Sequence, residues 1–240
     1  MKAASLASLA SRAFGIAGAF GIAGVLPFAS AQAAIPGSTT SAATYQVTIT
    51  QVELCQDSAC SASYVIGNST ASFDIASATA GADVGSYVDI SGIPLHQTWT
   101  HVRVTISTTI SIGGTWTDTD GDACGTSNQT QASGHAAVYA ASAGGNSTAA
   151  DFVIPNVGFS TIVQADYDAY NLSKSDGSST ATITYPIASP YTCKGDMPRI
   201  EVQFNTGSAL GYIPGTAAGV GTACQAFPLP PDVTITVSDP

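Results

Sequence analysis

The sequence predicts an all-β protein, a single antiparallel β-sandwich of about ten strands. Charged residues make up only 9% of the chain, against roughly 25% in ordinary globular domains. Thr, Val and Ile are frequent instead, and β-branched side chains suit the pleated surface of a sheet. Apolar and polar residues alternate in many short runs, while no amphipathic helix of useful length is visible. Alternation indicates sheets with one buried face and one wetted face.

The expected strands are short and are separated by clusters of Gly, Asn, Asp and Pro. The first alternates from Tyr45 to Ile49 and then slips in phase before Val52, which predicts a β-bulge. The longest alternation runs from Val102 to Ile112 and fits one strand or a bent pair. The remaining candidates are residues 72–76, 87–90, 136–140, 152–154, 159–163, 181–187, 200–204 and 233–237.

The first 33 residues have the pattern of a secretory signal peptide. A basic start precedes an apolar run over Ala13–Ala29 and a small-x-small cleavage site at Ala31–Ala33. A retained membrane anchor is the alternative, but the run of about 17 residues is short for a membrane span. We expect cleavage, no membrane span afterwards, a flexible leader over 34–43 and one domain over 44–240. The mature protein would be secreted, or held at the cell surface.

The net charge of the mature chain limits the classes of partner that it can bind. Lys2 and Arg12 belong to the signal peptide, so the mature part carries four cations against 16 acidic residues, a net charge of −12. Nucleic acids and anionic membranes are bound by Lys and Arg that neutralise phosphates. The sequence therefore argues against a nucleic-acid partner, and it favours solubility or cation binding outside the cell.

Five cysteines remain after cleavage, and in an exported protein they are disulfide candidates first. Cys55 and Cys60 flank a short polar turn and are expected to pair. Cys193 with Cys224 is the preferred second bridge, and Cys124 with Cys193 is the alternative. The odd thiol is then either buried or used to join subunits.

Three alternate carboxylates, Asp118, Asp120 and Asp122, surround a glycine turn and could direct oxygens at one Ca²⁺ ion. The EF-hand pattern is incomplete, because Gln129 stands where that pattern needs a bidentate Glu. A polar hairpin turn is the other interpretation. We expect a calcium site here, since three such close carboxylates repel one another without a cation.

Two further groups of polar residues could form sites. Asp166 and Asp168 would share one face of a strand, where they could form a site or a solvated, charged edge. His96 and His101 are an odd number apart, so an unbroken strand would point them to opposite faces. His135 is interpreted as a turn residue.

The stretch Tyr45–Ile112 resembles secreted bacterial surface domains with transthyretin- or immunoglobulin-like sandwiches. The residues that carry the resemblance are Phe73-Asp74-Ile75, Gly85-Ser86-Tyr87 and Thr100-His101-Val102-Arg103-Val104. The resemblance implies an immunoglobulin- or jelly-roll-like topology and a role in adhesion or surface assembly.

No catalytic motif is visible: there is no Gly-x-Ser-x-Gly elbow, no His-Glu-x-x-His and no phosphate-binding loop. We therefore expect a non-enzyme, a secreted structural subunit of an extracellular filament, pilus-like fibre or surface layer that self-associates. A calcium-assisted adhesin or glycan-binding module, with Trp99 and Trp116 stacking on sugars, is the alternative.

The last expected strand is the candidate means of assembly. Val233, Ile235 and Val237 give it one apolar face, and the proline-rich Phe227–Pro231 segment before it should be extended. Such a strand could exchange between subunits, or it could cross to the other sheet of its own sandwich.

Overall fold

The structure is a computed structural model that describes residues 38–77, 88–117, 121, 123–126, 130–131, 138–139, 146–158, 163–195, 198–213 and 225–239. The chain divides into two units, Met1–Ser30 and Ala31–Pro240. The first unit, and with it the expected signal peptide, lies outside the described residues. Everything below concerns the second unit.

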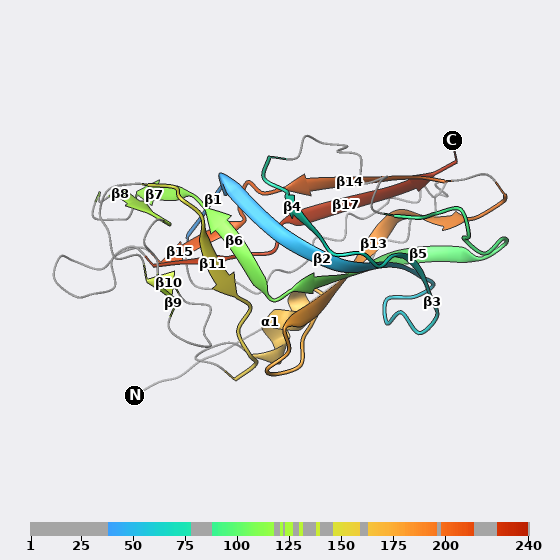
Figure 1. The fold of residues 1–240 in the computed structure, drawn as a ribbon, viewed down its shortest axis with the longest axis horizontal. Helices are drawn as coiled ribbons and strands as arrows, with labels where there is room; N and C mark the ends of the chain where they lie inside the picture. Colours follow the sequence, from blue (N-terminus) through green and yellow to red (C-terminus); the bar gives the residue numbers. More distant parts are fainter. Residues whose placement is uncertain are drawn as a thin grey trace, which may run out of the picture. The chain divides into compact units, whose positions relative to one another are not determined.

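The protein is all-β, as the alternation predicted. Three sheets contain the described strands (Figure 1). The largest has the order β11 (Ala150–Val153), β6 (Thr109–Gly113), β2 (Thr44–Cys55), β5 (Thr98–Ser107), β13 (Thr180–Thr192), β17 (Asp232–Ser238) and β14 (Arg199–Asn205), with β3 (Ser63–Gly67) and β4 (Ala71–Asp74) on β2 and β12 (Leu172–Ser173) on β13. The second has the order β1 (Ser38–Thr40), β15 (Leu210–Ile213), β16 (Gln225–Pro228), β10 (Val138–Tyr139) and β9 (Thr130–Gln131). The third pairs β7 (Thr115–Thr117) with β8 (Ala123–Gly125).

The largest sheet is mixed, which corrects the expectation of a purely antiparallel sandwich. The strands β13 and β17 are parallel and meet at Ile187 and Ile235. The reason is the path of the chain: β14, β15 and β16 intervene before β17 returns and inserts between β13 and β14. A parallel neighbour needs such a long connection, whereas a tight hairpin would have made the pair antiparallel.

The two irregularities that the sequence indicated in the early strands are confirmed. The pairing of β2 with β5 shifts register between Ile49 and Gln51, at the predicted bulge. The hydroxyl of Thr50, the residue in between, donates to the Thr105 carbonyl at 3.3 Å. The long alternation over 102–112 is a bent pair, since β5 and β6 are separated at Thr108, whose side chain is buried.

A segment between two expected strands is helical. The pair Asp166 and Asp168 lies on the helix α1 (Gln164–Ala169), so the expected shared face of a strand is wrong. The Asp166 carboxylate accepts from the Val163 amide at 2.8 Å, which caps the first turn. Tyr167 is buried and donates its hydroxyl to the Pro155 carbonyl. A local cap and one buried aromatic side chain therefore favour a helix here, although the spacing of Asp166 and Asp168 also fits one face of a strand.

Both ends of the described chain are more regular than expected. Within the expected flexible leader, Ser38–Thr40 pair with β15 and Ala42 is buried. In the expected polyproline link, Phe227 belongs to β16 and pairs with Gly211. A Cβ atom at position 211 would collide with the Phe227 ring, so the glycine permits this close pairing.

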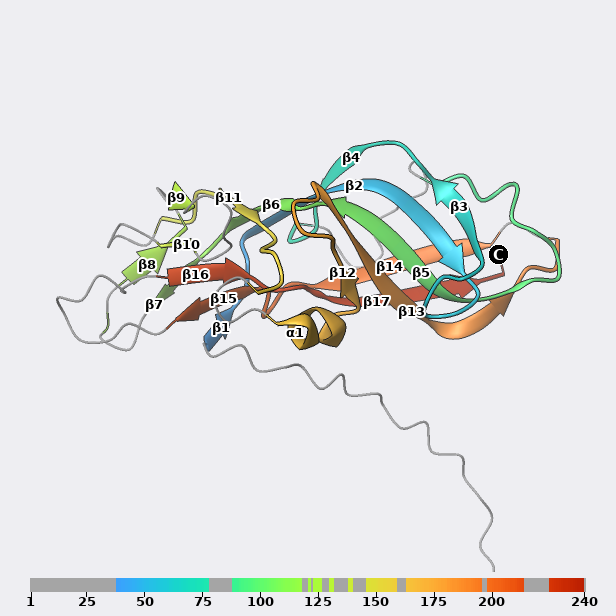
Figure 2. The same cartoon turned by 90° about the horizontal axis from the view of Figure 1, so that it is seen from below.

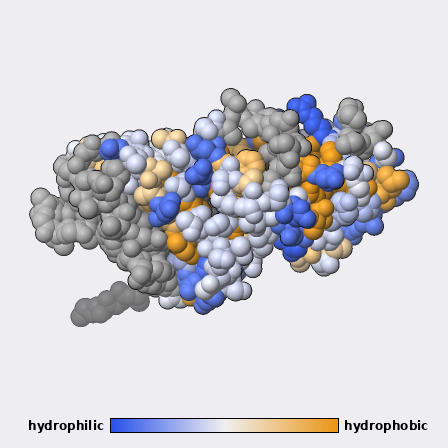
Figure 3. All heavy atoms as spheres, in the orientation of Figure 1, coloured by the Kyte–Doolittle hydropathy of each residue, from blue (hydrophilic) through white to orange (hydrophobic). Residues whose placement is uncertain are grey.

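Two clusters of buried side chains hold these sheets together. The first joins all three sheets and includes Tyr45, Ile112, Trp116, Phe152, Leu210 and Ala226. The second lies on the largest sheet and includes Leu54, Trp99, Val102, Ile187, Tyr191 and Ile235. On the face drawn in Figure 3, hydrophilic and hydrophobic side chains are interspersed.

Candidate functional site

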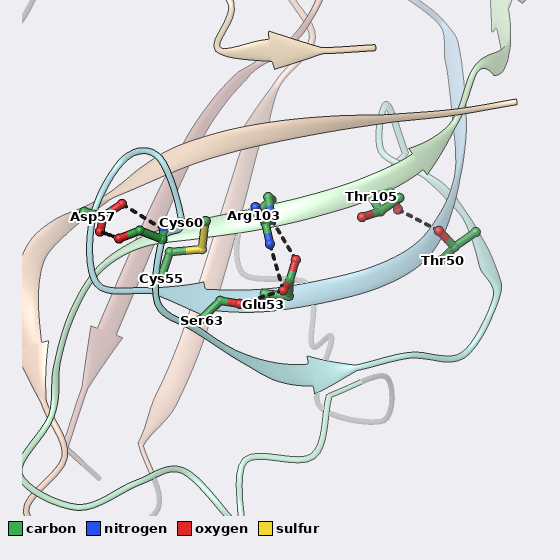
Figure 4. A network of polar contacts seen from close by, with 9 residues as sticks. Thr50, Glu53, Cys55, Asp57, Cys60, Ser63, Arg103 and Thr105 are labelled. Carbon is green, nitrogen blue, oxygen red and sulfur yellow. Dashed lines mark hydrogen bonds and ion pairs between the residues drawn. A yellow bond between two sulfur atoms is a disulfide. The ribbon is translucent and has the colours of Figure 1, made fainter. Parts of the chain in front are cut away.

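An ion pair between a half-buried arginine and a buried glutamate links the neighbouring strands β2 and β5. The Arg103 guanidinium donates from Nε to Glu53 Oε2 at 2.7 Å and from Nη2 to Oε1 at 2.9 Å (Figure 4). The Ser63 hydroxyl of β3 donates to the same Oε1 at 2.8 Å. Glu53 is 5% exposed. Its carboxylate is therefore held by two side chains from the strands on either side.

The electrostatics of Glu53 oppose a catalytic role. The hydrogen bonds from Arg103 lower the pKa of its carboxyl, burial raises it, and Ser63 lowers it again, with a net shift downwards. The same contact raises the pKa of Arg103. A general base works best with a pKa near the working pH. The Glu53 carboxylate instead stays ionised, and its oxygens already accept hydrogen bonds from Arg103 and Ser63. Together with Ser63, the ion pair connects the strands β2, β3 and β5 in their observed register. It also gives the arginine of the Thr-x-x-Arg-Val motif a structural role.

The predicted disulfide between Cys55 and Cys60 is confirmed. It closes a short loop in which the Asp57 carboxylate accepts from the Ser61 amide at 3.1 Å and from the Ser61 hydroxyl (Figure 4). These bonds lower the pKa of Asp57. Cys60 has φ 51°, a left-handed conformation that the surrounding covalent loop maintains.

The second predicted bridge is wrong, and so is its alternative, because Cys193 is a free thiol. It is 3% exposed and lies within the second core cluster, beside Trp99 and Tyr191. Cys124 is fully buried in β8 and does form a disulfide, whose other cysteine lies outside the described residues. Cys224 is also outside them. The odd thiol is therefore Cys193, and packing rather than pairing accounts for it.

The expected calcium ligands Asp118, Asp120 and Asp122 lie outside the described residues, as does His135. Within the described part of the chain, no group of three His, Cys, Asp or Glu side chains could hold a metal ion. His96 and His101 are not brought together in a shared site by any described contact: the His96 amide donates to the Cys193 carbonyl, while His101 contacts Thr100. Over the same described ranges, no helix is long and apolar enough to cross a membrane.

The expected exchange strand is an interior strand of its own sheet. Seven consecutive residue pairs join β17 to β14, from Asn205 with Asp232 to Arg199 with Ser238. Ile235 and Val237 are 2% and 8% exposed, and Val233 packs against the same core cluster. The structure thus has the intramolecular arrangement, in which β17 is paired on both sides within one chain.

The edge of the sheet is β14. Among the described strands it pairs with β17 alone and ends the strand order. Figures 1 and 2 show the two strands side by side. The apolar face of β14, formed by Ile200, Val202 and Phe204, is only partly buried. This edge was missed from the sequence, where residues 200–204 look like any other half-buried strand.

No protein-family model matches the chain, and no curated protein or solved structure is significantly similar to it. The resemblance to secreted surface domains therefore stays a prediction. In the structure, one of its motifs has a local role: the Asp74 carboxylate accepts from the Tyr45 amide at 2.9 Å and from the Ala76 amide at 3.2 Å. It ties the end of β4 to β2.

Proposed function

We propose that this protein is a secreted structural subunit of an extracellular filament or surface layer, and that its copies join by extending the largest sheet at β14. The outer side of β14, which pairs with no other described strand, carries the proposal. An edge strand presents unpaired N–H and C=O groups that another strand can complete. Natural sheets commonly protect such edges with charged side chains, especially Lys, with Pro or with a bulge. The seven residues of β14 contain no Pro and no bulge against β17, and their two charges, Arg199 and Glu201, are of opposite sign.

The half-buried apolar side chains of β14 give the same edge a hydrophobic component. Ile200 and Val202 pack against the second core cluster but remain partly exposed at the end of the sheet. An added strand would cover them and remove apolar surface from water. The opposite edge strand, β11, has only four residues and so offers a shorter template.

The covalent chemistry supports export. The Cys55–Cys60 disulfide and the disulfide at Cys124 are typical of oxidising compartments outside the cytoplasm. The signal-peptide pattern of the sequence agrees with this. We expect the protein recovered from an exporting host to lack residues 1–33, which the mass of the intact protein measures. A full-length chain retained in the cytoplasm would contradict the export part of the proposal.

Assembly is tested with the oxidised mature chain, beginning at Ala34, by sedimentation velocity over a wide concentration range and by negative-stain microscopy. We expect concentration-dependent association and, in the microscope, filaments or sheets. Val202→Lys should prevent association, because an inward-pointing lysine protects an edge. Val153→Lys on β11 is the matched control at the other edge and should still associate. A wild-type chain that stays monomeric at every concentration would refute the structural role.

A further inference from the structure

We infer that two copies of this chain pair β14 with β14 in an antiparallel manner, around a two-fold axis beside Ile200. The inference rests on the proposed function and names its partner, a second copy, and its register. It starts from the two charged residues of the edge strand. Arg199 and Glu201 are two positions apart, so they share the face of the sheet opposite to Ile200.

These two charges have no opposite charge of their own within the described residues. Across the strand pair they face Ser238 and Thr236 of β17, which are neutral. The ion pairs among the described residues join Glu53 to Arg103 and Lys194 to Asp239. Glu201 accepts one hydrogen bond, from Gln203 Nε2 at 3.1 Å. An arginine and a glutamate thus lie on the same face of the edge strand, and neither forms an ion pair with another described residue.

When two copies of β14 pair antiparallel around a two-fold axis, the Arg199 and Glu201 side chains of one copy can each lie opposite a residue of opposite charge in the other copy. With the axis beside Ile200, Arg199 lies opposite the partner's Glu201, and Glu201 lies opposite the partner's Arg199. Opposite charges directly across two strands stabilise a sheet, whereas like charges destabilise it. Both ion pairs form at one interface because an isologous contact repeats every interaction twice.

The neighbouring registers lack this complementarity. An axis beside Glu201 would place two carboxylates opposite each other. An axis beside Val202 would set Glu201 against the partner's Gln203 and Arg199 against the partner's Asn205, so that no ion pair forms. All three registers keep the apolar faces of both copies on the same side of the joined sheet. The charges therefore select the register centred on Ile200.

The interface is that of a dimer whose two largest sheets become one continuous sheet. The partly buried side chain of Ile200 would lie against its symmetry mate, continuing the second core cluster across the axis. A filament or layer then grows from this dimer through a further contact. Loss of the register centred on Ile200 and loss of all association are thus separate results.

Charge reversal tests the register. In sedimentation equilibrium, Arg199→Glu and Glu201→Arg should each weaken the dimer at least about tenfold, because each places like charges across the axis twice. The double variant restores opposite charges and should return to within about threefold of the wild type. Asp151→Arg on β11 is the matched control for Glu201→Arg, with the same change of charge at the other edge, and should leave the dimer unchanged.

Cross-linking tests the same register without altering charge. A cysteine at position 200 faces its own copy, within the Cα separation that a disulfide accepts. Ile200→Cys should therefore form an oxidised dimer, whereas Val202→Cys should not. If Val202→Cys cross-links instead, or if the charge reversals have no effect on an associating protein, the inference is overturned and the proposed function stands. A monomeric wild type overturns both.

Discussion

Ile235 is the side chain on which the interior position of β17 most depends. It is 2% exposed, pairs with Val202 of β14 on one side and meets Ile187 of β13 on the other. Ile235→Ala removes three carbon atoms from the second core cluster and leaves a cavity among well-packed side chains. We expect this substitution to lower the free energy of unfolding substantially, and to do so in a single isolated chain.

The magnitude follows from two contributions. Each buried methylene-sized group contributes roughly 0.8 kcal/mol, so three of them give about 2.4 kcal/mol. The unfilled cavity adds to this, and measured losses for Ile→Ala in protein cores span about 2–5 kcal/mol. We therefore expect a loss of about 3–4 kcal/mol, which lowers Tm by roughly 6–16 °C in a domain of this size.

Urea unfolding measured by tryptophan fluorescence gives this number, since Trp99 belongs to the same cluster. The protein is kept dilute, so that association contributes nothing. Thr236→Ala is the matched control: Thr236 is the next residue of β17 and is exposed. It should cost less than about 1 kcal/mol. A loss below 1 kcal/mol for Ile235→Ala, or a loss that appears only at high concentration, would refute an intramolecular β17.

Three further outcomes are expected. Glu53→Gln should cost about 1.5–3 kcal/mol, because it removes charge-assisted hydrogen bonds from an Arg103 side chain that is 27% exposed to solvent. Since the folded state lowers the pKa of Glu53, the pair stabilises the protein above the unfolded carboxyl pKa of about 4.3. That contribution is lost as the pH falls through the pKa of Glu53 in the folded state. The wild type should therefore lose stability in acid more steeply than Glu53→Gln. Urea unfolding of both proteins across this pH range measures the difference. Thiol titration should give one reactive group per unreduced chain, from Cys193, reacting quickly only after unfolding; a fast reaction in the native state would contradict its burial. Calcium in the range of roughly 0.1–1 mM should raise Tm, and Asp120→Ala should abolish the rise; titration calorimetry without heat would refute the site.

The sequence predicted local features of the fold well, because local patterns determine them. Alternation from Tyr45 to Ile49 and its slip before Val52 identified both a strand and its bulge. The short spacing of Cys55 and Cys60 identified their disulfide. In these cases the residues that decide the structure are close together in the chain, so spacing carries the information.

Long-range pairing could not be predicted in the same way. Cys193 belongs, with Trp99 and Tyr191, to a cluster built from distant strands, and nothing in its spacing distinguishes it from a bridged cysteine. The parallel neighbour of β13 likewise depends on where the chain returns after β16. The α1 helix was missed because the Asp166 carboxylate caps its first turn, and a search for alternating apolar residues does not detect such a cap.

The candidate site was predictable in part. Glu53 and Arg103 are charged residues inside alternating strands of a chain with few charges, which is a signal for a buried pair. Their partnership, however, depends on the register of β2 with β5. The open edge of β14 depends on strand order in the complete sheet, which no local pattern in residues 199–205 contains.

Hydrogen exchange of the oxidised mature chain, followed across concentration, distinguishes an intramolecular β17 from an exchanged one. We expect the β17 amides that face β14 to be protected at every concentration, because seven residue pairs join these two strands within one chain. The outward amides of β14 should exchange quickly in dilute solution and become protected as copies associate. Protection of β17 that rises with concentration would show strand exchange instead, and β14 amides that remain unprotected in assembled protein would contradict the edge as the interface.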